Sequence, residues 1–111
     1  MANVKQTNIY IGLNDSQTHE QKFDTQKYVS LLKGVCFSYH LSFSMQYVDG
    51  GYFHEDGTFV NENSLMLTLL DVPDEIIEDV ARDLCAFFNQ ESVMVTTTTA
   101  DIRFIQEKIE I

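Results

Sequence analysis

The sequence predicts an α+β fold in which two helices cover one face of an antiparallel sheet. Three observations lead to this prediction. Apolar residues recur at helical spacing over residues 74–88, with acidic residues on the opposite side. Apolar and polar residues alternate over residues 35–47, which is the period of a strand. The chain of 111 residues is long enough for one core. A one-sided helix must bury its apolar face, and a sheet provides the cover.

The first third of the sequence predicts a strand followed by a helix. Residues 7–13 alternate between apolar and polar side chains and are followed by turn-forming residues. Two starts are open for the helix. Thr18 with Gln21 forms a capping box, whereas Asp24 forms a cap flanked by a hydrophobic staple. We expect the earlier start and an end at Gly34.

The middle of the sequence predicts a long strand and a hairpin. The alternation over 35–47 gives the second strand, and Asp49-Gly50-Gly51 predicts a bend or a bulge within its continuation. Asp56-Gly57 is a strong hairpin signal, and residues 64–70 form the third strand. Between them the hairpin extends as an arm over residues 47–60.

The last third predicts a helix and a strand. Pro73 suits the first turn of the helix, which ends at Asn89-Gln90. The final strand follows over 91–105, with a bulge or a break near Thr99-Ala100 because its apolar positions change phase there. Residues 106–111 form a charged tail, either frayed or added as a sheet edge. Right-handed crossovers then place both helices on one face, which is the ferredoxin-like plait with an extended hairpin. We expect one domain over 1–111, with its core in about 7–105.

The sheet face opposite the helices carries small polar side chains. It is either solvated, as many antiparallel sheets are, or covered by a second chain that encloses a polar cleft. Its ligand-binding candidates are Tyr10, His40, Ser42, Ser44, Thr68 and Thr96. Tyr10 and His40 are also the catalytic candidates, because imidazole and phenol groups can transfer protons.

The arm carries the aromatic residues Tyr47, Tyr52, Phe53 and Phe59. A two-stranded ribbon cannot bury them alone, so we expect them to contact a partner in a homodimer or a higher homo-oligomer.

Metal-compatible donors lie around the tip of the hairpin, in His54, Asp56 and Glu62. Their spacing matches no metal-binding loop, and we expect no metal there.

Composition restricts the partners. A net charge of −10 argues against nucleic acid and anionic membrane surfaces as partners.

Residues 1–6 contain no apolar segment typical of a signal peptide, and we expect a cytoplasmic protein with free cysteines at Cys36 and Cys85. Gly50-Gly51 leads into no helix, so no phosphate-binding loop and no cofactor is expected.

Three segments resemble a family of small bacterial proteins of unknown function, some of them described as secreted proteins or lipoproteins. The segments are Asn-Ile-Tyr-Ile-Gly at 8–12, the hairpin over 51–64, and Phe-Asn-Gln-Glu-Ser-Val at 88–93. The sequence departs from the family by having Phe53 where tryptophan is usual and by lacking a signal peptide. The resemblance implies the plait fold and no particular reaction.

Three functions follow from these observations. The first is an oligomeric binding or regulatory module that uses the open sheet face or the arm. The second is a small cofactor-independent enzyme of the dimeric α+β barrel type, with His40 and Tyr10 in a cleft that takes a small molecule. The third is an interaction subunit whose acidic helix face docks a basic partner. We expect the first, because no catalytic constellation is visible in the sequence.

Overall fold

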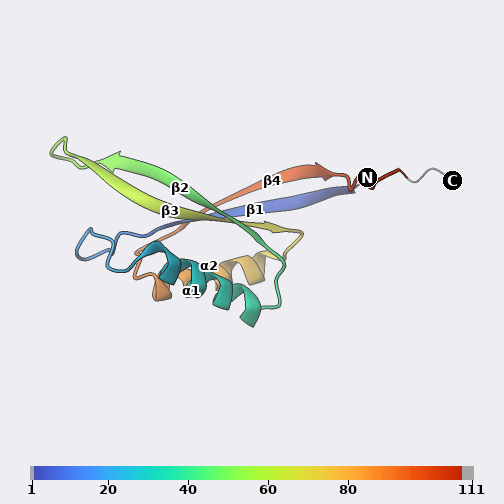
Figure 1. Cartoon of the computed structure of the whole chain (residues 1–111), viewed down its shortest axis with the longest axis horizontal. Helices are drawn as coiled ribbons and strands as arrows, with labels where there is room; N and C mark the ends of the chain where they lie inside the picture. The colour runs from blue at the N-terminus through green and yellow to red at the C-terminus, as the bar shows by residue number, and fades with distance from the viewer. Residues whose placement is uncertain (1, 109–111) are drawn as a thin grey trace.

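A computed structural model describes residues 2–108 and confirms the ferredoxin-like α+β fold. The four strands form one antiparallel sheet in the order β2-β3-β1-β4, and both helices lie on one face of it (Figure 1). The elements are β1 Ala2–Gly12, α1 Thr25–Ser38, β2 Ser44–Phe53, β3 Phe59–Leu70, α2 Asp74–Phe87 and β4 Met94–Ile102. No helix within residues 2–108 combines the length and apolarity that crossing a membrane requires.

The core lies between the two helices and the central strands. Alternate residues in the central parts of β1 and β3 face it, and the apolar stripes of the helices complete it. Its fully buried members are Ile9, Ile11, Leu13, Leu32, Cys36, Leu65, Leu67, Leu69, Val80 and Leu84.

Four strands lie side by side only in the middle of the sheet. The β1–β3 pairing runs from Gln6↔Leu70 to Gly12↔Ser64, whereas the β2–β3 pairing continues to Phe53↔Phe59. The arm is therefore a two-stranded ribbon that extends beyond the helices (Figure 1). The paired ends of β1 and β4 form a second ribbon at the opposite end. The result is an elongated molecule of 64 × 27 × 25 Å.

The predicted start and end of the first helix are wrong. Asp24 caps α1 by accepting a hydrogen bond from the Lys27 N–H at 3.1 Å. Thr18 belongs to the preceding loop, where its N–H donates to the Asp15 carboxylate at 3.1 Å. Gly34 does not end the helix, because the apolar stripe continues through Val35, which is buried against the core.

The predicted start of the second strand is also wrong. Residues 35–38 form the last turn of α1, and β2 begins only at Ser44. Leu32, Val35 and Cys36 lie at i, i+3 and i+4, so the alternation overlaps a helical stripe, and burial of that stripe decides the outcome. Ser38 therefore lies in a helix, while His40 and Ser42 lie in the turn and loop that follow, outside the sheet.

The two predicted bulges are absent from the described strands. Gly50 pairs with Glu62 and Gly51 with Asn61 in an unbroken register. The β1–β4 register likewise continues through Thr99 and Ala100, opposite Lys5 and Val4. The change of phase in the apolar pattern of β4 corresponds to no irregularity of the strand. This part of β4 extends beyond the helices, so neither of its faces packs in the core.

The predicted hairpin turn is confirmed. Gly57 adopts φ 88°, and the His54 N–H donates to the Thr58 carbonyl at 2.8 Å. After β4, residues 103–108 have no regular secondary structure, and the rest of the predicted tail lies outside the described residues.

Cys36 and Cys85 are both free, as the sequence predicted. Cys36 is buried, and its burial raises the pKa of the thiol to about 11.

Candidate functional site

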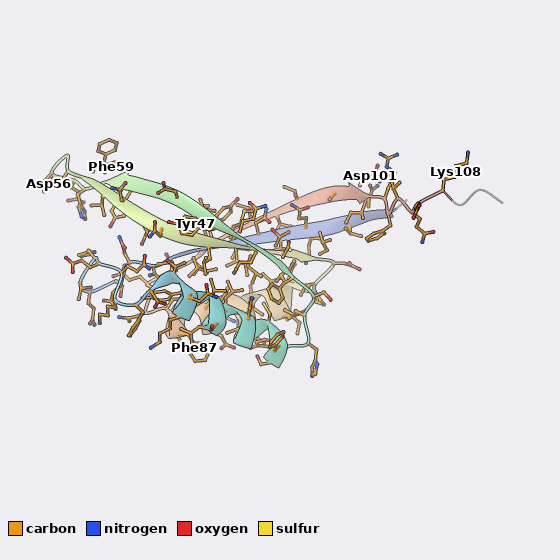
Figure 2. All side chains as sticks on the ribbon, viewed as in Figure 1. Tyr47, Asp56, Phe59, Phe87, Asp101 and Lys108 are labelled. Carbon is orange, nitrogen blue, oxygen red and sulfur yellow. The ribbon has the colours of Figure 1, made fainter. Side chains whose placement is uncertain are left out.

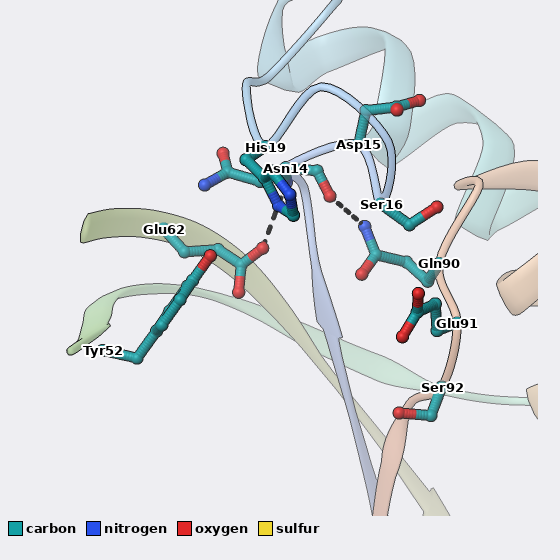
Figure 3. Close-up of a pocket in the computed structure, with 9 residues that line it drawn as sticks. All are labelled: Asn14, Asp15, Ser16, His19, Tyr52, Glu62, Gln90, Glu91 and Ser92. Atoms are coloured by element: carbon teal, nitrogen blue, oxygen red, sulfur yellow. Dashed lines mark hydrogen bonds between the residues drawn. The ribbon is translucent and has the colours of Figure 1, made fainter. Parts of the chain in front are cut away.

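A hollow of about 390 Å³ lies at the carboxyl end of β1, where three segments meet. They are the β1–α1 loop, the arm and the junction between α2 and β4 (Figure 3). Since β1 runs antiparallel to both β3 and β4, the end of β1 and the starts of those strands lie at the same end of the sheet. The hollow is lined by Asn14, Asp15, Ser16, His19, Tyr52, Glu62, Gln90, Glu91 and Ser92.

Asp15 holds the β1–α1 loop against the α2–β4 junction. One carboxylate oxygen accepts hydrogen bonds from the N–H groups of Gln17 and Thr18, at 2.8 and 3.1 Å. The other accepts from the Asn89 side-chain amide at 2.6 Å and lies 3.3 Å from the Lys22 ammonium. The Asn89 bond, followed by the Gln17 bond, holds the pKa of this carboxyl well below its usual range. Asp15 therefore fixes one wall of the hollow as an anion.

Asn14 joins the other two segments. Its carbonyl accepts a hydrogen bond from the Gln90 side chain at 2.5 Å, which ties it to the junction. Its N–H donates to Glu62 Oε2 at 3.2 Å, and its side-chain amide donates to the Asn61 carbonyl at 3.2 Å, which ties it to β3 next to the arm. The position of Glu62 is thus set by the end of β1 as well as by β3.

Aromatic rings close one side of the hollow. His19, in the left-handed conformation with φ 59°, contacts the His54 ring edge-on at a centroid distance of 5.8 Å. His54 in turn contacts the Tyr52 ring at 5.3 Å. The tip of the arm is therefore linked to the β1–α1 loop through ring contacts.

The hollow is acidic. Asp15 is balanced by Lys22, whereas no ion pair within residues 2–108 neutralises Glu62 or Glu91. These two carboxylates come from opposite sides, Glu62 of β3 beside Tyr52 of the arm, and Glu91 beside Ser92 on the junction (Figure 3). A polar, acidic hollow with a phenol ring suits a small cationic ligand.

The residues predicted on the open sheet face are only partly brought together. Ser42, Ser44 and Thr68 line a smaller hollow of about 260 Å³ at the far end of the sheet. Tyr10 lies near the carboxyl end of β1, opposite Met66 and Met94.

The predicted pairing of His40 with Tyr10 has no support in the strand pattern, because His40 lies in the turn after α1 with φ 54°. Thr68 donates to the Asn8 side chain at 2.7 Å, and Thr96 pairs with Asn8 from the other side. Neither Tyr10 nor His40 lines the acidic hollow.

The arm keeps most of its aromatic residues exposed. Phe53 is 72% exposed and packs edge-on against Phe59, which is 50% exposed. Figure 2 shows Phe59 projecting away from the layer of helices. Tyr47 is 53% exposed and donates to the Asn63 side chain. Tyr52, at 36% exposed, is the least exposed of the four and lines the hollow.

The predicted metal donors have separate roles. Asp56 accepts a hydrogen bond from the Thr58 N–H at 2.9 Å, which stabilises the hairpin turn and lowers the pKa of the Asp56 carboxyl. Glu62 lies in the hollow, and His54 contacts Tyr52. Within residues 2–108, no three His, Cys, Asp or Glu side chains form a group that could hold a metal ion.

Most of the hollow is missing from the sequence-based candidates. The sequence predicts only a turn at residues 14–16, and it predicts only the start of the last strand at Glu91 and Ser92. The available signal was topological: the predicted strand order places the loops after β1 and α2 at the same end of the sheet. Polar residues in two loops that converge are stronger candidates than residues spread over an open face.

No protein-family model matches the chain, and no curated protein matches it either. Among solved structures, a phage SAM lyase in complex with S-methyl-5′-thioadenosine aligns with a TM-score of 0.67 and 19% identity, over 96% of this chain and 92% of that one. The phage SAM lyase in the apo state aligns at 0.64 and 20%, over 97% and 93%. CutA1 from Oryza sativa aligns at 0.56 and 13%, over 92% and 85%. At these identities the similarity shows the fold.

Proposed function

We propose that this chain binds S-adenosylmethionine (SAM) in the acidic hollow and cleaves it, releasing S-methyl-5′-thioadenosine. The observation that carries the proposal is the hollow itself, in which Glu62, Glu91 and Tyr52 converge. The alignment of nearly the whole chain with a phage SAM lyase supports it. This proposal favours the enzyme over the binding module that the sequence suggested.

The charge of the ligand fits the charge of the hollow. SAM carries a positive sulfonium and a positive ammonium group, and Glu62 and Glu91 supply carboxylates on two sides of the hollow. The Tyr52 ring adds an aromatic face, which attracts cations. A volume of about 390 Å³ lies within the range of small-molecule sites.

The reaction requires that one bond to sulfur breaks. The thioadenosine product keeps the methyl group and the 5′-carbon, so the bond between sulfur and the Cγ atom of the amino-acid chain is cleaved. Its electron pair stays on sulfur, which becomes a neutral thioether. The substrate's own carboxylate oxygen can form the new bond to Cγ, which closes a five-membered lactone and requires neither water nor a proton.

This route assigns positioning as the main task of the protein. The attacking oxygen of the substrate carboxylate must lie in line with the S–Cγ bond that breaks. Holding the two reacting groups in that geometry can supply most of a rate enhancement. Glu62 and Glu91 would hold the sulfonium and ammonium groups. Carboxylates alone stabilise the cationic ground state, so the gain comes from the bound conformation and not from charge at the reacting sulfur.

The test is incubation of the purified protein with SAM, followed by chromatographic measurement of S-methyl-5′-thioadenosine. Glu62→Gln keeps the size of the side chain and removes its charge. We expect it to lower kcat/KM by about 10- to 100-fold, since a hydrogen bond to a charged group contributes roughly 1.5–3 kcal/mol.

Gly34→Ala is the matched control, because an added Cβ there meets nothing within 4 Å, and its rate should equal that of the wild type. Release of S-methyl-5′-thioadenosine that Glu62→Gln leaves unchanged would place the reaction elsewhere. Binding of SAM without release would favour the binding module.

We also propose that the chain forms a homo-oligomer through the arm. The supporting observation is the exposed pair Phe53 and Phe59, since each aromatic side chain can bury about 150–250 Å². Packed against each other and over Gly51 at the end of a two-stranded ribbon, they leave apolar surface for a second copy.

Light scattering of the 12.8 kDa chain at tens of micromolar tests the proposal. We expect an oligomer that Phe53→Asp with Phe59→Asp dissociates while helical circular dichroism persists. A monomeric wild type would exclude the oligomer, and an oligomer that survives both charges would exclude the arm as its interface.

A further inference from the structure

Gly12 is the last residue of β1, and its missing side chain makes room for the Glu62 carboxylate. A Cβ atom built on Gly12 would lie 2.5 Å from Glu62 Oε2, 2.6 Å from Cδ and 2.7 Å from Oε1. All three carboxylate atoms therefore occupy the space that any other residue would fill.

The backbone does not itself demand glycine at this position. Gly12 lies in a strand, paired with Ser64 of β3. Gly57 is the glycine with positive φ among the described residues, so Gly12 has a conformation open to other residues. Close approach of the carboxylate is the remaining reason for a glycine here.

We propose that Gly12 is a positioning residue that directs the Glu62 carboxylate into the hollow. The open space at Gly12 receives the carboxylate, and the Asn14 N–H, two residues further on, fixes it by donating to Oε2 at 3.2 Å. The end of β1 thus orients a side chain that belongs to β3. The functional part of this role rests on the proposed function of Glu62.

The other glycines provide matched comparisons. At Gly51 a Cβ would lie 2.6 Å from the Val60 carbonyl, so the backbone of the arm would have to move. At Gly12 the obstacle is the end of a flexible side chain, which can rotate away. Gly12→Ala should therefore displace the carboxylate and leave the fold intact.

The experiment measures release of S-methyl-5′-thioadenosine from SAM by the wild type, Gly12→Ala and Gly34→Ala. We expect Gly12→Ala to lower kcat/KM by about 10- to 100-fold, as Glu62→Gln does, with an unchanged melting temperature. Gly34→Ala should equal the wild type. Adding Glu62→Asp to Gly12→Ala should restore part of the activity, because the shorter side chain clears the new methyl group.

A second readout follows the carboxylate itself. The Asn14 amide resonance in a nitrogen–proton correlation spectrum should shift in Gly12→Ala, since its hydrogen bond to Glu62 is lost, and should stay in place in Gly34→Ala. An unmoved Asn14 resonance, or a wild-type rate in Gly12→Ala, overturns the role of Gly12.

A wild type that releases no product overturns the proposed function instead, and the Asn14 resonance still reports whether Gly12 places the carboxylate. Should Gly12→Ala unfold, recovery of the fold by Glu62→Asp supports the proposal, and failure to recover overturns it.

Discussion

The strand β3 passes through two environments with one sequence pattern. In the middle of the sheet its alternate residues Leu65, Leu67 and Leu69 are 0% exposed, beneath the helices. In the arm the same alternation leads to Phe59, which is 50% exposed. Periodicity therefore defines a face of the strand, whereas the layer above that face decides whether it is core. The hollow lies where the two environments meet, because there β3 leaves the helices and its side chains face loops.

The largest loss of stability should come from a substitution in the core, where the helices cover the sheet. Leu84→Ala deletes a fully buried side chain of α2 and leaves a cavity, so we expect a loss of about 2–5 kcal/mol in the free energy of unfolding. Leu70→Ala, at a position that is 44% exposed, should cost much less. Chemical denaturation measures both. Equal losses would mean that burial between the helices and the sheet does not decide how much an apolar side chain contributes to stability.

A smaller loss of stability should come from a substitution in the arm. Gly51→Ala forces a Cβ to within 2.6 Å of the Val60 carbonyl and 2.4 Å of the Phe59 ring, and we expect a loss of about 1–3 kcal/mol. Gly50→Ala is the neighbouring control, because its Cβ would make an ordinary contact of 3.7 Å with the Glu62 carbonyl. Denaturation midpoints that fall equally for both variants would contradict the close packing of Phe59 on Gly51.

The smallest expected effect on stability concerns Asp15, which lines the hollow between the covered part of the sheet and the arm. Because the folded pKa of Asp15 is depressed below its ordinary value of 3.8, its ionised form stabilises the fold above that pH. This contribution is lost as the pH falls from about 4 toward the folded pKa. Asp15→Asn should be less stable near neutral pH, and its stability should depend less on pH below 4. Thermal melts from pH 7 to pH 2 test this, and parallel curves for the two proteins would contradict it.

The fold was predictable where one physical signal dominated. Helix α2 has a sharply one-sided pattern and an acidic first turn, and the hairpin turn has Gly57 at the position that needs positive φ. The start of helix α1 differs from the prediction because the carboxylate of Asp15, three residues earlier, accepts the Thr18 N–H in a local turn that competes with the capping box. The span from Val35 was misread because a helical turn and a strand share those apolar positions.

The site was less predictable than the fold. Tyr52 and Glu62 were identified for other roles, as an interface residue and a metal donor, and the structure brings both to the hollow. Asn14 and Asp15 had only turn propensity to mark them. Their importance arises from contacts with residues more than 40 positions away, such as Glu62 and Asn89, which no local pattern records.

The central claim is that the hollow recognises a cation through Glu62, and calorimetric titration tests it most directly. The ligands are S-adenosylhomocysteine, whose sulfur is neutral, and an uncleavable SAM analogue with an amine-bearing carbon in place of the sulfonium. We predict that the cationic analogue binds about 10- to 100-fold more tightly to the wild type, and that Glu62→Gln removes most of this preference. Equal affinities in the wild type, or a preference that persists in Glu62→Gln, would contradict the account.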